Sequence, residues 1–127
     1  MDEAMARLAE QVTAALSAAD PDQFAHLLDP NVTWGAPGDP APSCRNRRQV
    51  LAWYQRGRAG GRRAEVHRVT THGDKILVAM TVTSADGPAS GRGEPRWQVL
   101  TVVDGRIADI RGYDDEQDAR DAAGVRN

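Results

Sequence analysis

Three side chains in the second half of the chain have the chemistry for acid–base catalysis. Asp109 and Arg111 stand two residues apart in the stretch 106–113, and His67 lies in the stretch 62–71. A carboxylate beside a guanidinium can act as a general base, because the cation stabilises its charged form. An imidazole can carry a proton near neutral pH, although His67 could equally be an exposed or hydrogen-bonded strand residue. Asp109, Arg111 and His67 are therefore the candidate catalytic residues.

The orientation of the stretch 106–113 decides whether the Asp109 and Arg111 pair is available for chemistry. Strict alternation along a strand places both residues on one face with Ile107 and Tyr113. The other face then carries Ala108, Ile110 and Gly112. If that first face looks inward, the pair can meet a substrate. If the smaller, apolar face looks inward, the pair is a solvent-exposed ion pair.

Four strands over residues 62–113 are predicted to form the centre of the fold. Residues 75–84 alternate, and both faces are largely apolar, which indicates a central strand that is covered on both sides. Residues 95–103 and 106–113 flank Asp104-Gly105, a pair typical of a type I′ hairpin because both positions accept a positive φ. The last two strands are therefore expected to be antiparallel neighbours.

Helices are expected before this sheet. Apolar residues at helical spacing predict a first helix over residues 2–19. Asp20-Pro21 predicts the start of a second, short helix, which carries Leu27 and Leu28 and stops at Asp29-Pro30.

A short strand and a third helix complete the expected N-terminal half. The strand covers residues 31–34, and a loop rich in glycine and proline covers residues 35–43. Asn46-x-x-Gln49 has the form of a capping box and predicts a third helix that runs to Gly57. Residues 114–118 could begin a terminal helix or fray.

The order of helix, helix, strand, loop, helix and four antiparallel strands predicts an α+β protein. The chain resembles the nuclear transport factor 2-like superfamily, and within it the SnoaL-like branch of small bacterial proteins. The resemblance is carried by three stretches: residues 24–34, with a short helix, Asp-Pro and a strand ending in an aromatic; the helix 46–57 with Trp53-Tyr54; and the close Asp104-Gly105-Arg106-Ile107-x-x-Ile110-x-x-Tyr113-x-Asp115.

The resemblance implies a cone, in which the N-terminal helices cover the concave face of a curved antiparallel sheet around a pocket, and usually a homodimer made through the sheet. It implies either a cofactor-independent isomerase, cyclase or hydrolase acting on a small hydrophobic molecule, or a non-catalytic ligand-binding or interaction module. Ketosteroid isomerases place a general base at the end of the first strand. Trp34 stands there in this chain, and because an indole cannot accept a proton as a carboxylate does, isomerase chemistry is disfavoured.

Aromatic residues on the elements that wall such a cone are candidates for binding a ligand. Small-molecule sites combine large apolar walls with a few convergent polar groups. Trp53 and Tyr54 stand about 100° apart on a helix, so only one of them can point fully inward. Any of these aromatic residues could instead belong to the core. The candidate ligand-binding residues are Trp34, Tyr54, Trp97 and Tyr113.

Composition narrows the classes of function. The 127 residues are expected to form one domain, and the net charge of −2 gives no general attraction to nucleic acid or membrane. No apolar run is long enough for a membrane span and no signal peptide is recognisable, so we expect the chain in the cytoplasm. A lone cysteine, scattered histidines and the lack of a phosphate-binding loop predict no metal and no cofactor.

One stretch of the chain is strongly basic although the net charge of the whole chain is small. Eight arginines between Arg45 and Arg68 are interrupted by a single acid, Glu65. Such a cluster can bind phosphates, an acidic ligand or a partner protein. It could also complement the acidic tail of its own chain, residues 114–121. Because the rest of the chain is correspondingly acidic, nucleic-acid binding is not expected.

Overall fold

A computed structural model describes residues 3–18, 21–38, 43–59, 61, 63–83 and 93–125, and the structural statements below concern these residues. In chain order its elements are α1 (Glu3–Ala18), α2 (Pro21–Ala25), β1 (Leu28–Gly35), α3 (Arg47–Ala59), β2 (Arg63–His72), β3 (Lys75–Thr83), β4 (Glu94–Val103), β5 (Arg106–Tyr113) and α4 (Glu116–Ala123).

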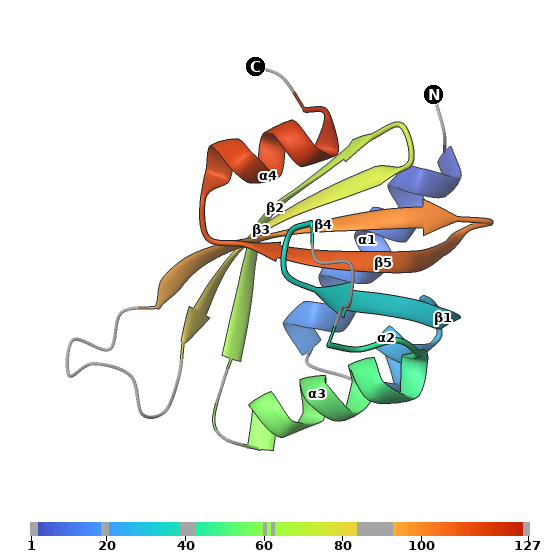
Figure 1. Ribbon diagram of the computed structural model, residues 1–127, viewed down its shortest axis with the longest axis vertical. Coiled ribbons are helices and arrows are strands. Elements are labelled where there is room, and N and C mark those ends of the chain that lie inside the picture. The colour runs from blue at the N-terminus through green and yellow to red at the C-terminus, as the bar shows by residue number, and fades with distance from the viewer. Residues whose placement is uncertain are drawn as a thin grey trace.

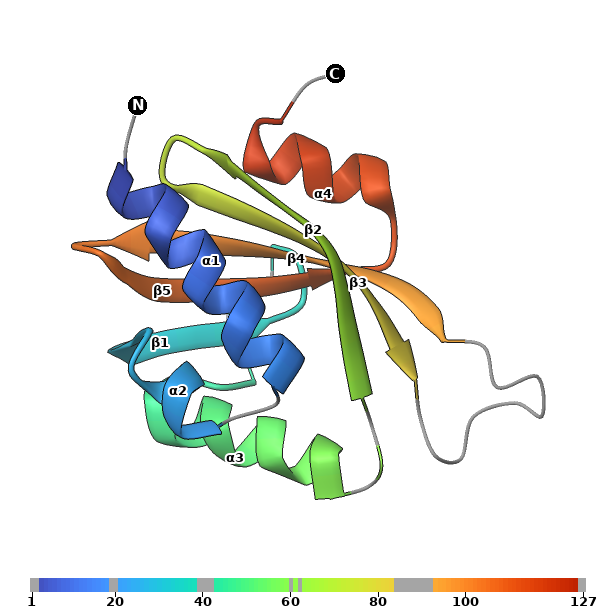
Figure 2. The same ribbon diagram turned by 180° about the vertical axis from the view of Figure 1, so that it is seen from behind.

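The five strands form one curved, unclosed sheet in the order β1-β5-β4-β3-β2. The four strands from β2 to β5 are antiparallel neighbours, as predicted, whereas β1 joins the sheet by pairing parallel with β5. Helices α1 and α2 lie across one face of the sheet, which we call the inner face (Figure 2). Helix α4 lies on the opposite, outer face (Figure 1). The α+β cone expected from the sequence is confirmed.

The main hydrophobic core lies between the inner face and helices α1, α2 and α3. Every residue of the apolar stripe predicted for the first helix is buried there, because residues three and four apart share one side of a helix. From the sheet, this core takes the even-numbered positions of β3, together with Leu100 of β4 and Val32 of β1. Alternate side chains of a strand share a face, so these positions define which residues look inward.

A second, smaller core lies on the outer face beneath α4. Leu77 of β3 and Val99 of β4 are buried there against Ala119 and Ala123 of the helix. Asp115 caps the start of α4 by accepting a hydrogen bond from the Asp118 backbone, 3.0 Å away. Both faces of β3 are therefore covered, as the alternating apolar pattern predicted, and the terminal segment is a helix.

The predicted extent of the second helix was wrong. Helix α2 ends at Ala25, and Leu28 already begins β1, where it pairs with Ile107. Asp29-Pro30 therefore lies within a strand. Proline is tolerated there because β1 is an edge strand, and a missing N–H on the free edge costs no ladder hydrogen bond.

The predicted alternation of the last strand was also wrong. Ile107 and Ile110 are both fully buried in the inner core, although they are three residues apart. The register between β4 and β5 shifts at this point, because Thr101 pairs with Asp109 while Val102 pairs with Ile107. Such a bulge inserts one extra residue and reverses the faces that follow it. From Asp109 onward, the odd-numbered residues of β5 look outward.

Two local predictions, a hairpin turn and a helix cap, are confirmed. Asp104 and Gly105, which link β4 to β5, have φ values of 53° and 78°, as a type I′ turn requires. The side chain of Asn46 accepts a hydrogen bond from the Gln49 backbone at 2.9 Å and so caps α3. Three glycines and a proline in residues 85–94 also predict a link between two strands. This stretch lies outside the described residues up to residue 92, and Glu94 belongs to β4. None of the described helices has the length and apolar character to span a membrane.

Candidate functional site

Two of the four aromatic candidates for ligand binding lie on the inner side of the sheet. Trp34 of β1 pairs with Ile110 and is partly buried against the inner core. Tyr54 of α3 packs on Phe24 of α2, with 5.4 Å between the ring centroids and a tilt of 39°. These aromatic rings come from three elements that converge over one end of the inner face.

The inner face is open at one position of β5. Gly112 follows Ile110 on the inward side of β5 and pairs with Gln98 of β4. A Cβ atom built on Gly112 would meet no other atom within 4 Å. Gln98 is only partly buried, and its neighbour on the same side of the strand, Arg96, forms an ion pair of 2.9 Å with Glu94. A polar rim therefore follows the apolar part of the inner face.

Helix α3 turns only one of its two adjacent aromatics inward. Val50 is fully buried, and Tyr54 follows it by four residues on the same side of the helix. Trp53 is rotated by about 100° and is 46% exposed. The prediction that only one of the two points fully inward is confirmed.

The other two aromatic candidates lie on the outer face. Trp97 of β4 pairs directly with Tyr113 of β5, and both are partly buried beside the small core under α4. Burial raises the pKa of the Tyr113 phenol; Arg111 opposes this rise, and the carboxylates of Asp109 and Asp118 add to it. Trp34 and Tyr54 therefore lie on the inner side of the sheet, and Trp97 and Tyr113 lie on its outer face.

Asp109 and Arg111 lie next to each other on the outer face. The Arg111 Nε atom donates to both carboxylate oxygens of Asp109 at 3.1 Å, and the Thr33 hydroxyl donates to Oδ1 at 2.5 Å. Arg111 also donates from Nη1 to the Ala36 carbonyl oxygen at 2.8 Å. The exposed fractions of the two side chains are 26% and 20%. The pair thus ties the end of β1 to β5 while its carboxylate stays accessible to solvent.

His67, the third catalytic candidate, is distant from this pair in the sheet and is exposed. It lies where the β2–β3 register shifts between Val66 and Arg68, and its Nε2 atom is 2.5 Å from the Thr81 hydroxyl. The structure brings together Asp109 and Arg111 but does not bring His67 to them.

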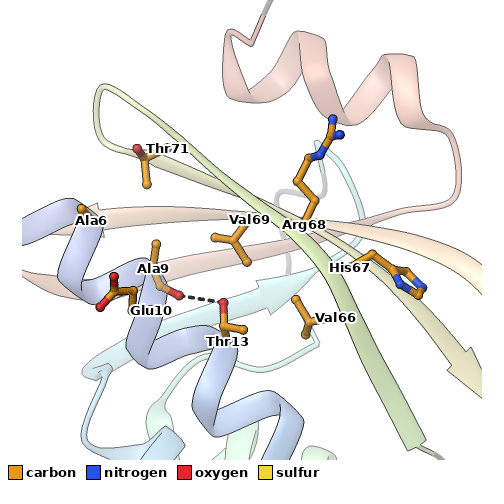
Figure 3. Close-up of a pocket in the computed structure, with 9 residues that line it drawn as sticks. All are labelled: Ala6, Ala9, Glu10, Thr13, Val66, His67, Arg68, Val69 and Thr71. Carbon is orange, nitrogen blue, oxygen red and sulfur yellow. Dashed lines mark hydrogen bonds between the residues drawn. The ribbon is translucent and has the colours of Figure 1, made fainter.

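A shallow groove runs between α1 and β2 close to His67 (Figure 3). Val66, Val69 and Thr71 of β2 point toward α1 across it, whereas the His67 and Arg68 side chains point away from the helix. Its volume is about 400 Å³, and Ala6 and Ala9 of α1 complete its apolar surface. Glu10 and Thr13 of α1 also line the groove, and the Thr13 hydroxyl donates to the Ala9 carbonyl oxygen at 3.0 Å.

No group of three or more histidine, cysteine, aspartate or glutamate side chains among the described residues is arranged to hold a metal ion. The thiol of Cys44 is buried beside Trp34, with which it exchanges two backbone hydrogen bonds of 3.0 Å. Burial raises the pKa of this thiol, and the nearby Arg56 only partly opposes the effect, so the thiolate is disfavoured.

Sequence reasoning missed Gln98 and Gly112 as inward-facing residues. Gln98 was recognisable only from its register with the alternating residues of β3, since Val78 is its partner. Gly112 was correctly assigned to the face opposite Asp109. That this position is open became recognisable only once the neighbouring strands were placed.

Similarity to solved structures supports the fold. The chain matches Bal32a from a soil-derived mobile gene cassette with a TM-score of 0.74 and 21% identity, over 95% of this chain and 96% of that one. It matches an epoxide hydrolase from M. tuberculosis of the LEH-like type with a TM-score of 0.66 and 25% identity, over 92% and 86%. It also matches a predicted polyketide cyclase from Sinorhizobium meliloti, with a TM-score of 0.67 and 23% identity over 88% and 100%.

Sequence comparison gives the family. Among curated proteins, none matches the chain. The family model of the SnoaL-like domain matches residues 9–110, which include the strands β1 to β4 and most of β5. The aromatic end of the first strand and the Asp-Gly hairpin, on which the resemblance was based, both lie inside this match. The chain therefore belongs to the SnoaL-like domain family.

Proposed function

We propose that this protein binds a small hydrophobic molecule between the inner face of the sheet and helices α1 to α3, without a cofactor. The observation that supports this function best is the space beside Gly112, where a Cβ atom would have no neighbour within 4 Å. Trp34 and Tyr54 supply partly buried aromatic surface near this end of the inner face. Large apolar walls next to an unfilled space are the general form of a small-molecule site.

The polar groups near this space indicate the chemistry of the ligand. Gln98 is neutral, and its amide can both donate and accept a hydrogen bond. The charged groups in register with the inner face, Arg96 and Glu94, neutralise each other at the rim. We therefore expect an uncharged ligand that contains a ring and one hydrogen-bonding group.

Filling the space tests this function. We expect Gly112→Leu to weaken the binding of a ligand by at least about tenfold, since a leucine side chain would occupy the volume of several ligand atoms. Binding would be measured by tryptophan fluorescence and thermal shift against a panel of cyclic ketones, aromatic polyketide-type compounds and epoxides. Ala52→Leu adds the same side chain to the exposed side of α3 and should leave binding unchanged.

The proposal would be overturned if no member of the panel bound the wild-type protein, or if Gly112→Leu bound as tightly as Ala52→Leu. A closed interior filled by its own side chains would then be the better description, and the protein would be an interaction module. Urea denaturation of both variants shows whether a loss of binding merely reflects unfolding.

Acid–base catalysis at Asp109 is a second candidate function. It is supported by one arrangement, in which a solvent-accessible carboxylate is held by Arg111 and the Thr33 hydroxyl. The solved structures similar to this chain include an epoxide hydrolase and a predicted polyketide cyclase. If Asp109 is the general base, Asp109→Asn should lower the turnover of an identified substrate by about 100-fold or more. A loss of turnover in His67→Gln would show that the imidazole has a separate role. Full turnover by Asp109→Asn would exclude this role.

We also propose that the protein is cytoplasmic and forms a homodimer through the outer face of its sheet. The support is a strip of small and aromatic residues there, in which Ala79 pairs with Trp97 and Trp97 with Tyr113. Ala79→Arg should then convert the dimer to a monomer in light scattering at high salt. Ala122→Arg, on the exposed side of α4, is the control. A wild-type monomer at high salt would contradict the dimer.

A further inference from the structure

The outward side of α3 carries exposed basic residues. Arg48 and Arg56 are exposed on the helix, and Arg45 is exposed just before it. Trp53 lies beside Arg56, three residues away, and is 46% exposed although most tryptophans are largely buried. Among the described residues, none of these three arginines forms an ion pair with a carboxylate. We call Arg45, Arg48, Trp53 and Arg56 the α3 patch.

The excess of acidic residues is at the other end of the molecule. Exposed carboxylates gather on α4 and the turn before it, and this α4 patch consists of Asp114, Glu116, Asp118 and Asp121. Helices α3 and α4 lie at opposite ends of the protein, with the sheet between them (Figures 1 and 2). The three arginines of the α3 patch are therefore not neutralised by the acidic tail of their own chain, which was one of the interpretations that the sequence left open for the arginine cluster.

Opposite charges at two ends of one molecule favour contact between copies. We propose that the α3 patch of one copy binds the α4 patch of a second copy, head to tail. The arginines would pair with carboxylates, and the exposed indole of Trp53 would be covered by the partner. Because the two surfaces differ, the contact is heterologous, so each copy keeps a free patch and further copies can add.

A second copy fits the α3 patch better than a nucleic acid does. The whole chain has a net charge of −2, so a polyanion would be repelled by the acidic end of the molecule. In a head-to-tail contact, by contrast, each acidic end meets a basic one. This association is distinct from a dimer through the outer face, since it depends on charge and can extend beyond two copies.

Sedimentation of the full chain at two salt concentrations tests the proposal. At about 10 mM NaCl charges interact over roughly 30 Å, and at about 1 M over roughly 3 Å. We expect the weight-average mass to rise steadily with protein concentration at low salt and to stay constant at high salt. Quenching of tryptophan fluorescence by acrylamide should decrease with association, and this change should disappear in Trp53→Phe.

Charge reversal locates the contact. Arg48→Glu with Arg56→Glu, and separately Asp114→Lys with Asp121→Lys, should each weaken the low-salt association by at least about tenfold. A mixture of the first variant with unaltered protein should still form pairs through the remaining α3 patch. Arg7→Glu with Arg106→Glu changes the net charge equally at two other exposed positions and should leave the association intact.

Three results would overturn the proposal: a mass at low salt that does not depend on concentration, equal loss of association in the Arg7 and Arg106 control, or unchanged association after reversal of either patch. Binding of a labelled single-stranded oligonucleotide by the wild type but not by Arg48→Glu with Arg56→Glu would assign the patch to nucleic acid instead.

Discussion

The two faces of the sheet differ in the size of their cores and in the polar groups that they carry. The inner face contributes to a core that includes residues of α1, α2 and α3, in which Ile107 and Ile110 are fully buried. The outer face contributes to a small core under α4 and carries the Asp109–Arg111 ion pair beside it. One strand, β5, supplies both. The bulge after Ile107 allows Ile107 and Ile110 both to face inward, and the alternation that follows it turns Asp109 and Arg111 outward.

The inner face thus buries most of the apolar side chains of the sheet, whereas the outer face carries the charged pair. Removing a charged pair from water carries a high cost, so the large core of the inner face excludes it. On the outer face the pair keeps 26% and 20% of its side-chain surface exposed, and solvent can complete its hydration. A ligand on the inner face would therefore meet aromatic and amide groups, whereas a substrate of Asp109 would have to approach from the outer face.

The largest effect is expected in the inner core. Ile110→Ala removes a fully buried side chain and should lower the free energy of unfolding by about 3 kcal/mol, through lost burial and a residual cavity. Urea denaturation measures this change. Val103→Ala is the control, since Val103 is 49% exposed and should change stability by less than about 0.5 kcal/mol. Equal effects in the two variants would contradict the assignment of the inner core.

A smaller effect is expected in the core of the outer face. Leu77→Ala should lower the free energy of unfolding by about 2 kcal/mol, because α4 is short and can partly close the cavity. It should also speed hydrogen exchange in α4 more than in α1, since Leu77 lies beneath Ala119 and Ala123. If exchange in both helices increased equally, the two cores would unfold as one unit. The inner and outer cores would then not differ in local stability.

The smallest effect concerns Tyr113 and appears only at alkaline pH. Burial raises the pKa of its phenol above the ordinary value of 10.0. The unfolded chain therefore loses this proton first, so the stability from the neutral phenol is present below pH 10 and declines as pH rises through the folded-state pKa. Tyr113→Phe should show a shallower loss of stability above pH 10. An identical slope in wild type and variant would show that Tyr113 is not buried in this way.

The sequence predicted most of the architecture, because its signals are local. The apolar stripe of α1, the Asp104-Gly105 turn and the Asn46 cap each depend on residues within one or two turns of chain, and all three are confirmed. The end of α2 was missed because Leu27 and Leu28 fit a helix equally well. Pairing of Leu28 with Ile107, about 80 residues away, decides in favour of a strand.

The candidate site was less predictable, because its geometry depends on register. The residue types of Asp109 and Arg111 indicated an ion pair, and the ion pair is present. Their face depended on a bulge between β4 and β5, which has no signature in the residues of β5 alone. The open position at Gly112 likewise depends on how the neighbouring strands are placed.

Local periodicity and turn chemistry thus determined by themselves that this chain has an α+β fold, whereas the SnoaL-like family was first indicated by a resemblance and then shown by the match to the family model. Only the tertiary structure decided which residues look into the cone. A strand has two equivalent faces until another element covers one of them, and a shift of a single residue in register exchanges the two. The inward side of Gly112 and the outward side of Asp109 are therefore properties of the assembled sheet.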